Sequence, residues 1–129
     1  MADKRRKNSL IKMADEIVAQ SNLVREGTIP KSYDGQTASF SVAVAISGLK
    51  PAVAIYMKDG DTVKNNIIGL LADMCNNDEE CSLQAPFEGA PAFSRFIKRL
   101  PDGQVPEWKN RIIEYAIALK LTVRTYKLV

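Results

Sequence analysis

The sequence predicts an all-α fold, a single compact bundle of about six helices of which one is short. Apolar residues recur at three- and four-residue steps along most of the chain, which is the period of a helix with one buried face. Glycine and proline separate these stretches, and no segment predicts a strand convincingly. The 129 residues suit one domain, and a content of 46% hydrophobic and 26% charged residues is typical of a folded chain.

The first predicted helix covers residues 9–25 and follows a basic N-terminal arm, residues 1–8. The sequence of the arm is MADKRRKN. A basic segment at a chain end is usually solvated, but it can also contact nucleic acid. The helix begins at Ser9, which is a suitable N-cap, and its apolar stripe ends before Gly27. We therefore divide the chain into this arm and one helical domain, residues 9–129.

Two apolar stretches on either side of Gly48 predict the second and third helices. The second, residues 36–47, follows an Asp-Gly turn signal and is rich in small side chains that suit close packing. Its β-branched residues alternate, which leaves a strand conceivable, but the intervening Ala43 and Ala45 are apolar too and favour a buried helix. The third helix, residues 51–58, begins with a proline, whose missing N–H costs nothing in a first turn.

A fourth helix over about residues 62–74, capped by Asp61 or Thr62, precedes the longest predicted loop, residues 76–91. This acidic loop, NNDEECSLQAPFEGAP, carries glycine and proline near its end. A short helix over residues 92–100 comes next, and basic residues occupy its other sides: Arg95, Lys98 and Arg99.

The last predicted helix begins at Pro106 and shows the clearest pattern. Its apolar seam runs from Trp108 to Tyr126 at four- and three-residue steps. Four basic residues of this segment fall within one sector of about 60° on a helix: Lys109, Lys120, Arg124 and Lys127. These four side chains suit one anionic surface, or they only cover the edge of the apolar seam and complement the helix dipole.

Charge is unevenly distributed along the chain. Residues 1–58 carry nine basic and five acidic side chains, a net charge of +4. Residues 59–88 carry one basic and seven acidic side chains, a net charge of −6, and residues 89–129 carry eight and three, a net charge of +5. A basic face suits an anionic polymer and an acidic face suits a basic protein surface; the alternative is a solvated surface of mixed charge.

The composition argues against several classes of chemistry. Histidine is absent, which removes the usual general base and His-ligated metals. Cys75 and Cys81 are not spaced as a zinc ribbon, and without a signal peptide we expect cytoplasmic free thiols. The acidic runs at residues 59–61 and 78–80 are typical of a capped turn and a solvated loop. We expect no catalytic residue, no cofactor, no metal and no membrane span.

Two blocks of the sequence resemble the small subunit of type III-B (Cmr-type) CRISPR effector complexes. The first, YDGQTASFSVAVAISGLKPAVAIYMK, contains the Gly35-Gln36, Ser39-Phe40 and Gly48-Leu49 pairs. The second comprises AIALKL, residues 116–121, and the terminal YKLV, residues 126–129. The order and spacing of these short motifs, the chain length and the acidic central loop carry the resemblance. The proline that follows Gly48-Leu49-Lys50 departs from it.

The resemblance implies a non-catalytic subunit that stacks in several copies beside the backbone subunits and lines the channel of the target RNA. Cleavage would belong to the backbone subunit. The implied partners are other Cmr-type subunits, the duplex of CRISPR RNA and target RNA, bound through its phosphates, and further copies of the chain itself. The alternatives are a stand-alone DNA-binding regulator that uses the basic arm, although no polar recognition helix is evident, and a lysine- or carboxylate-based enzyme.

Charge geometry selects the side chains expected to make these contacts. The candidates for RNA binding are Lys4, Arg5, Arg6, Lys7, Lys50, Lys109, Lys120, Arg124 and Lys127. The candidates for a contact with another subunit are Asp78, Glu79 and Glu80.

Overall fold

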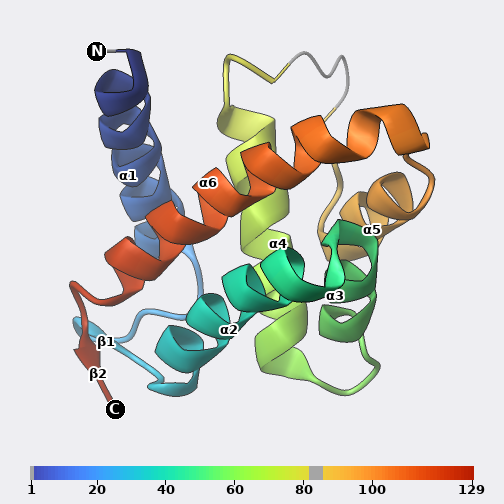
Figure 1. Cartoon of the computed structure of the whole chain (residues 1–129). Helices are drawn as coiled ribbons and strands as arrows, with labels where there is room; N and C mark the ends of the chain where they lie inside the picture. Colours follow the sequence, from blue (N-terminus) through green and yellow to red (C-terminus); the bar gives the residue numbers. More distant parts are fainter. Residues whose placement is uncertain (1, 82–85) are drawn as a thin grey trace.

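The computed structural model describes residues 2–81 and 86–129, and over these residues the chain forms six α-helices (Figure 1). The helices are α1 (Ala2–Gln20), α2 (Ser32–Ser47), α3 (Leu49–Tyr56), α4 (Thr62–Asn77), α5 (Ala90–Lys98) and α6 (Val105–Val123). A single 3-10 turn, Asp102–Gln104, precedes α6. The predicted all-α bundle is confirmed.

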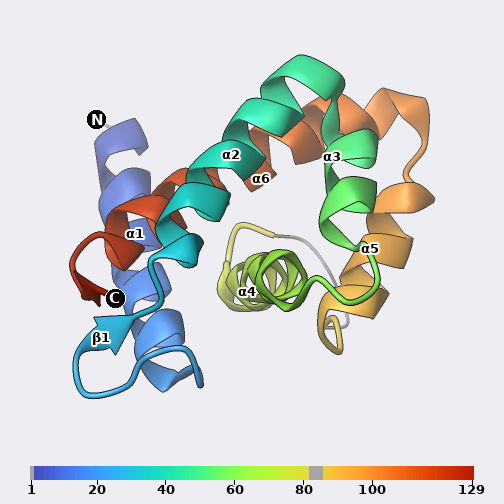
Figure 2. The same ribbon diagram turned by 90° about the horizontal axis from the view of Figure 1, so that it is seen from below.

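Helix α4 lies at the centre of the bundle and contacts each of the other α-helices. Figure 2 shows it end-on, with α1 on one side, α3 and α5 on the other, and α2 and α6 across the top. Apolar side chains surround most of its circumference and are buried: Ile67, Ile68, Leu70, Leu71, Ala72, Met74 and Cys75. A helix that is apolar on most of its sides is stable only when neighbours cover it, which explains the central position of α4.

Helices α2 and α3 confirm the helical interpretation of the apolar central block. Gly48, at φ 95° and ψ 164°, ends α2 in a backbone conformation that favours glycine. Phe40 of α2 is fully buried, and its ring packs edge-to-face on Tyr56 of α3 with ring centres 4.9 Å apart. The Tyr56 hydroxyl donates a hydrogen bond to the Gln36 carbonyl at 2.9 Å, which ties the two helices together.

The first helix starts and ends earlier than predicted. Helix α1 begins at Ala2 and stops at Gln20, so the basic residues expected in a separate arm lie on α1. Leu10, Ala14 and Val18 form its buried stripe at four-residue steps. Lysine and arginine are good helix formers, which lets the helix continue on the N-terminal side of this stripe. Positive φ angles at Glu26 and Gly27 then turn the chain toward β1.

Two short strands that the sequence does not predict join the segment between α1 and α2 to the C-terminal residues. Strand β1 (Thr28–Ile29) pairs in parallel with β2 (Lys127–Leu128). The strands are far apart in the sequence, so local periodicity gives no signal for them. Helix α6 therefore ends at Val123 and does not reach Tyr126.

Several boundaries near turns also differ from the prediction. Helix α2 begins at Ser32, so the Asp34-Gly35 pair lies inside its first turn and is not the turn before it. Helices α4 and α5 extend into the predicted loop of residues 76–91 from both sides, and residues 82–85 of that loop lie outside the described part of the chain. The predicted Asp61 cap is confirmed, since its carboxylate accepts a hydrogen bond from the Lys64 N–H at 3.2 Å.

Candidate nucleic-acid interface

Arg6 is half-buried and is bound by three carboxylates of the same chain. Its guanidinium donates two hydrogen bonds to Asp78, from Nη1 to Oδ1 at 3.2 Å and from Nη2 to Oδ2 at 2.9 Å. The same group lies 2.7 Å from a Glu80 oxygen and 3.3 Å from a Glu114 oxygen. These contacts join α1, the turn after α4, and α6. An arginine with this many internal partners has little capacity left for an external phosphate.

Asp78 is the buried centre of this network and is not an accessible acidic residue. Its side chain is only 4% exposed, and its Oδ2 also accepts a hydrogen bond from the Tyr115 hydroxyl at 2.6 Å. Burial alone would raise the pKa of Asp78, but the hydrogen bonds from Arg6 and Tyr115 hold that pKa below its ordinary value. The prediction that Asp78 contacts another subunit is therefore wrong, because the side chain is used within the chain.

The lowered pKa of Asp78 makes stability depend on acid pH. A carboxylate with a depressed folded-state pKa stabilises the fold above its unfolded-state pKa, 3.8, and this stabilisation is lost as the pH falls through the folded-state pKa. We expect wild-type protein to be more stable than the Asp78→Asn variant near neutral pH. The difference should shrink as the pH falls below about 4. Urea unfolding of both proteins from neutral to acid pH measures it, and a difference that is independent of pH would contradict the assignment.

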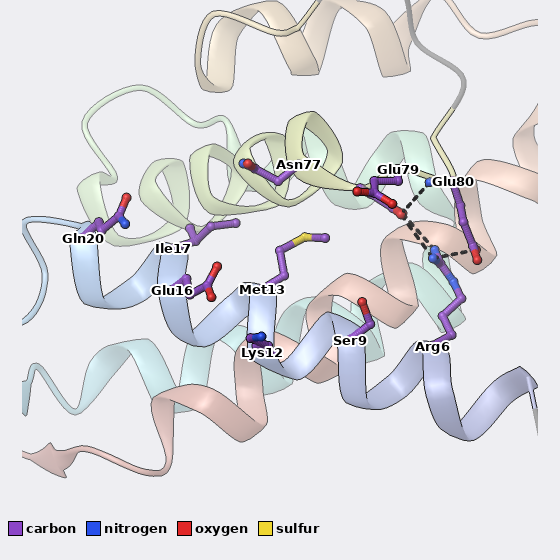
Figure 3. Close-up of a pocket in the computed structure, with 11 residues that line it drawn as sticks. Arg6, Ser9, Lys12, Met13, Glu16, Ile17, Gln20, Asn77, Glu79 and Glu80 are labelled. Carbon is purple, nitrogen blue, oxygen red and sulfur yellow. Dashed lines mark hydrogen bonds and ion pairs between the residues drawn. The ribbon is translucent and has the colours of Figure 1, made fainter.

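Glu79 and Glu80 remain at the surface, beside a groove between α1 and the end of α4. The groove encloses about 470 Å³, and Met13 and Ile17 of α1 form its apolar part. Figure 3 shows Arg6 reaching across one end of it toward Glu80. These two glutamates are the part of the predicted acidic contact surface that stays accessible.

The predicted basic face of the last helix is only partly formed. Lys109 and Lys120 lie on α6 and are half-buried. Arg124 caps the end of α6, and its Nε lies 2.8 Å from a carboxylate oxygen of Asp34. Lys127 is exposed on β2, beyond the helix, so the sector calculated for a continuous helix does not apply to it. The predicted alignment of all four residues on one helical face is wrong, because α6 ends at Val123.

Lys50 has an internal role. Its Nζ donates a hydrogen bond to the Leu100 carbonyl at 2.6 Å, just beyond the end of α5. A lysine at this position satisfies a carbonyl that the helix leaves unpaired. Lys50 therefore joins α3 to the end of α5. Its ammonium group also places a positive charge at the end of α5.

Lys4, Arg5 and Lys7 are exposed on α1. No ion pair joins any of the three to a side chain that the structure describes from Lys4 onward. They keep the accessibility that phosphate binding requires, in contrast to Arg6 in the same segment.

Helix α5 forms a basic hollow that the sequence analysis did not select. Arg95 and Arg99 are exposed and line a hollow of about 420 Å³ together with Gln104. Its apolar lining includes Phe96 and Leu100. Within the described part of the chain no carboxylate lies at ion-pair distance from either arginine. Two guanidinium groups and an amide donor around one hollow suit a phosphate group.

Aromatic packing fixes the position of α5. Gly89, at φ 90°, turns the chain into the helix. Phe87 packs on Phe93 and on Phe96, with ring centres 5.0 Å apart in both pairs, and Phe96 packs on Trp108 of α6 at 4.9 Å. These contacts bury the apolar face of α5 and leave its basic side toward solvent. The sequence does contain a signal for the hollow, since residues 95–99 include three basic side chains. Local sequence patterns do not show that this segment lies beside Gln104.

The described residues contain no group of three or more side chains that could hold a metal ion. None of the helices that the structure describes is long and apolar enough to cross a membrane. Comparison of the chain with protein-family models, with curated proteins and with solved structures found no match. Fold and site together describe an all-α bundle with accessible basic groups on α1 and α5.

Proposed function

We propose that this chain is a non-catalytic small subunit of a type III-B CRISPR effector complex that contributes to antiviral defence in the cytoplasm. Several copies stack along the backbone subunits and line the channel that receives the target RNA. Cleavage of the target belongs to the backbone subunit. The proposal rests on the sequence blocks that resemble this family and on the surface described above.

The observation that carries the RNA-binding part of the proposal is the basic hollow on α5. Arg95 and Arg99 are exposed, line one hollow and lack an acidic partner among the described residues. A channel that accepts any target sequence must contact phosphates and not base edges, and arginine forks are suited to this contact. Lys4, Arg5 and Lys7 on α1 offer a second set of accessible basic groups.

Exposed aliphatic side chains on α2 and α3 support the assembly part of the proposal. Val42 and Ile46 lie one turn apart on α2 and are 54% and 79% exposed, and Ile55 on α3 is 51% exposed. Single exposed apolar side chains are common, but neighbouring ones such as Val42 and Ile46 that share one helical face favour a protein interface. We assign these three residues to the contact with a neighbouring subunit.

The alternative of a stand-alone DNA-binding regulator has less support. It relies on the basic residues of the N-terminal segment, and Arg6 of that segment is occupied by Asp78, Glu80 and Glu114. Helix α2 exposes the aliphatic side chains of Val42 and Ile46 where a recognition helix needs polar ones.

Assembly of the chain into a type III-B particle tests the proposal. Wild-type protein should join a particle assembled without its small subunit and co-sediment with it. The Ile46→Glu variant should bind the particle at least about tenfold more weakly, because the interface would bury an unpaired charge. Asn110→Glu, an exposed substitution on α6, is the control and should assemble normally. A wild-type chain that stays free of the particle would contradict the proposal.

A further inference from the structure

Two thiols face each other at the end of α4. Cys75 lies in the last turns of the helix and is buried, and Cys81 lies in the following turn and is half-buried. Their sulfur atoms are 3.1 Å apart, and both residues are free cysteines. A disulfide has a sulfur separation of about 2.05 Å, so a movement of roughly 1 Å would bring the two atoms to bonding distance.

The backbone between the two cysteines is held in the shape that brings them together. The Asp78 N–H donates to the Cys75 carbonyl at 3.3 Å, and the Cys81 N–H donates to the Asp78 carbonyl at 3.0 Å. The Glu80 N–H donates to the Asp78 carboxylate at 3.0 Å. Arg6 binds the same carboxylate, so the turn that brings the two sulfur atoms together is also held by contacts to α1.

The two sulfurs differ in their surroundings. Cys75 is 2% exposed, and its burial raises the pKa of its thiol. Cys81 is more accessible, and Nη1 of Arg111 lies 3.8 Å from its sulfur. Oxidation of a cysteine by a solvent oxidant requires access to its sulfur, which Cys81 offers more than Cys75. Cys81 is therefore placed to react first with an oxidant from solvent, and Cys75 is placed to complete the reaction.

We propose that Cys75 and Cys81 form a dithiol that a hydroperoxide oxidises to an intramolecular disulfide. The Cys81 thiolate attacks one peroxide oxygen, the O–O bond breaks, and the products are a sulfenic acid at Cys81 and the water or alcohol of the reduced peroxide. The Cys75 sulfur then attacks the Cys81 sulfur, its proton and the hydroxyl group leave as water, and the S–S bond forms. Both thiols are oxidised by two electrons in total, and the hydroperoxide is reduced by two.

The disulfide would close a short loop that contains Asp78. Oxidation would fix this turn to α4 and would restrain the carboxylate that holds Arg6 and Tyr115. Reversible disulfides in reducing compartments are usually redox-responsive, and a thiol reductant would restore the dithiol. This inference goes beyond the proposed function and does not depend on it.

Oxidation of the full chain by hydrogen peroxide tests the proposal. After brief treatment with a small molar excess, we expect loss of both thiols, a mass lower by two hydrogen atoms, a monomer on a non-reducing gel, and a peptide that links Cys75 to Cys81. Dithiothreitol should restore both thiols, the original mass and the unlinked peptides. Persistence of both thiols, addition of oxygen to Cys81 without a link, or covalent dimers would each overturn the proposal.

The Cys81→Ala variant is the matched control. Its Cys75 is buried and should remain a thiol under the same treatment. The Cys75→Ala variant should instead show a Cys81 sulfenic acid that dimedone traps, since the second thiol is missing. The wild-type measurement decides the proposal by itself if the substitution of the buried Cys75 prevents folding.

Discussion

The Arg6→Ala variant is expected to lose about 3 kcal/mol of unfolding free energy or more. The substitution removes the bidentate partner of Asp78, whose side chain is 4% exposed, and leaves a buried carboxylate without its counter-charge. Tyr115 and the Glu80 N–H would still donate to Asp78, but neither supplies positive charge. The exposed glutamate partners of Arg6 contribute little, so the effect comes mainly from Asp78.

Arg5→Ala is the matched control for this substitution. Arg5 is the adjacent residue on the same helix, is exposed, and makes no ion pair with a described residue. Its removal should change stability by no more than about 0.5 kcal/mol. Urea unfolding of the three proteins gives the comparison. Equal stabilities of the two variants would contradict a structural role for Arg6 and would return it to the set of RNA-binding candidates.

The double variant Arg95→Gln, Arg99→Gln is expected to weaken target-RNA binding by the assembled complex at least about tenfold at low salt. Glutamine keeps a polar, hydrogen-bonding side chain, although a shorter one, and the substitutions remove both positive charges from the hollow on α5. Each lost phosphate contact should also lower the salt dependence, so the slope of log affinity against log salt should fall by about 2. Filter binding over a range of salt concentrations measures both effects.

Arg25→Gln, Lys31→Gln is the control for the loss of two charges. Both residues are exposed near β1, outside the α5 hollow, and the same net charge is removed. Binding should remain close to that of wild type. Equal losses of RNA affinity in the two double variants would mean that only the overall charge of the chain matters. Unchanged affinity in both variants would mean that α5 does not contact the RNA.

A second comparison addresses the C-terminal residues that the sequence favoured. The variant with glutamate at Lys120, Arg124 and Lys127 tests them as a group in the same assay. We expect a weaker effect per charge than at α5, because Arg124 is paired with Asp34 and Lys120 is half-buried.

Local sequence signals predicted the helical architecture well. The apolar periodicity of residues 62–74 predicted α4. Gly48 predicted the break between α2 and α3, because a right-handed helix ends at a residue with a positive φ angle. The Asp61 cap also follows from neighbours in the sequence. These features depend on contacts within a few residues, which one sequence contains.

The site depended on contacts between residues far apart, which local patterns do not contain. Arg6 and Asp78 are separated by 72 positions, and nothing in either segment distinguishes Arg6 from Arg5 or Asp78 from Glu79. Likewise, Lys127 leaves the helical sector because β2 pairs with β1. The sequence shows which side chains carry a charge. Whether each of these side chains is accessible to a ligand depends on how the helices pack.

The central claim, that the chain is a subunit of a type III-B effector, is tested most directly by purification of the tagged full chain from its native host. Proteomics and small-RNA sequencing of the eluate identify what comes with it. The account predicts Cmr-type subunits, including the backbone subunit, together with guide RNAs derived from CRISPR repeats. An eluate that contains this chain alone, without RNA, would contradict the account.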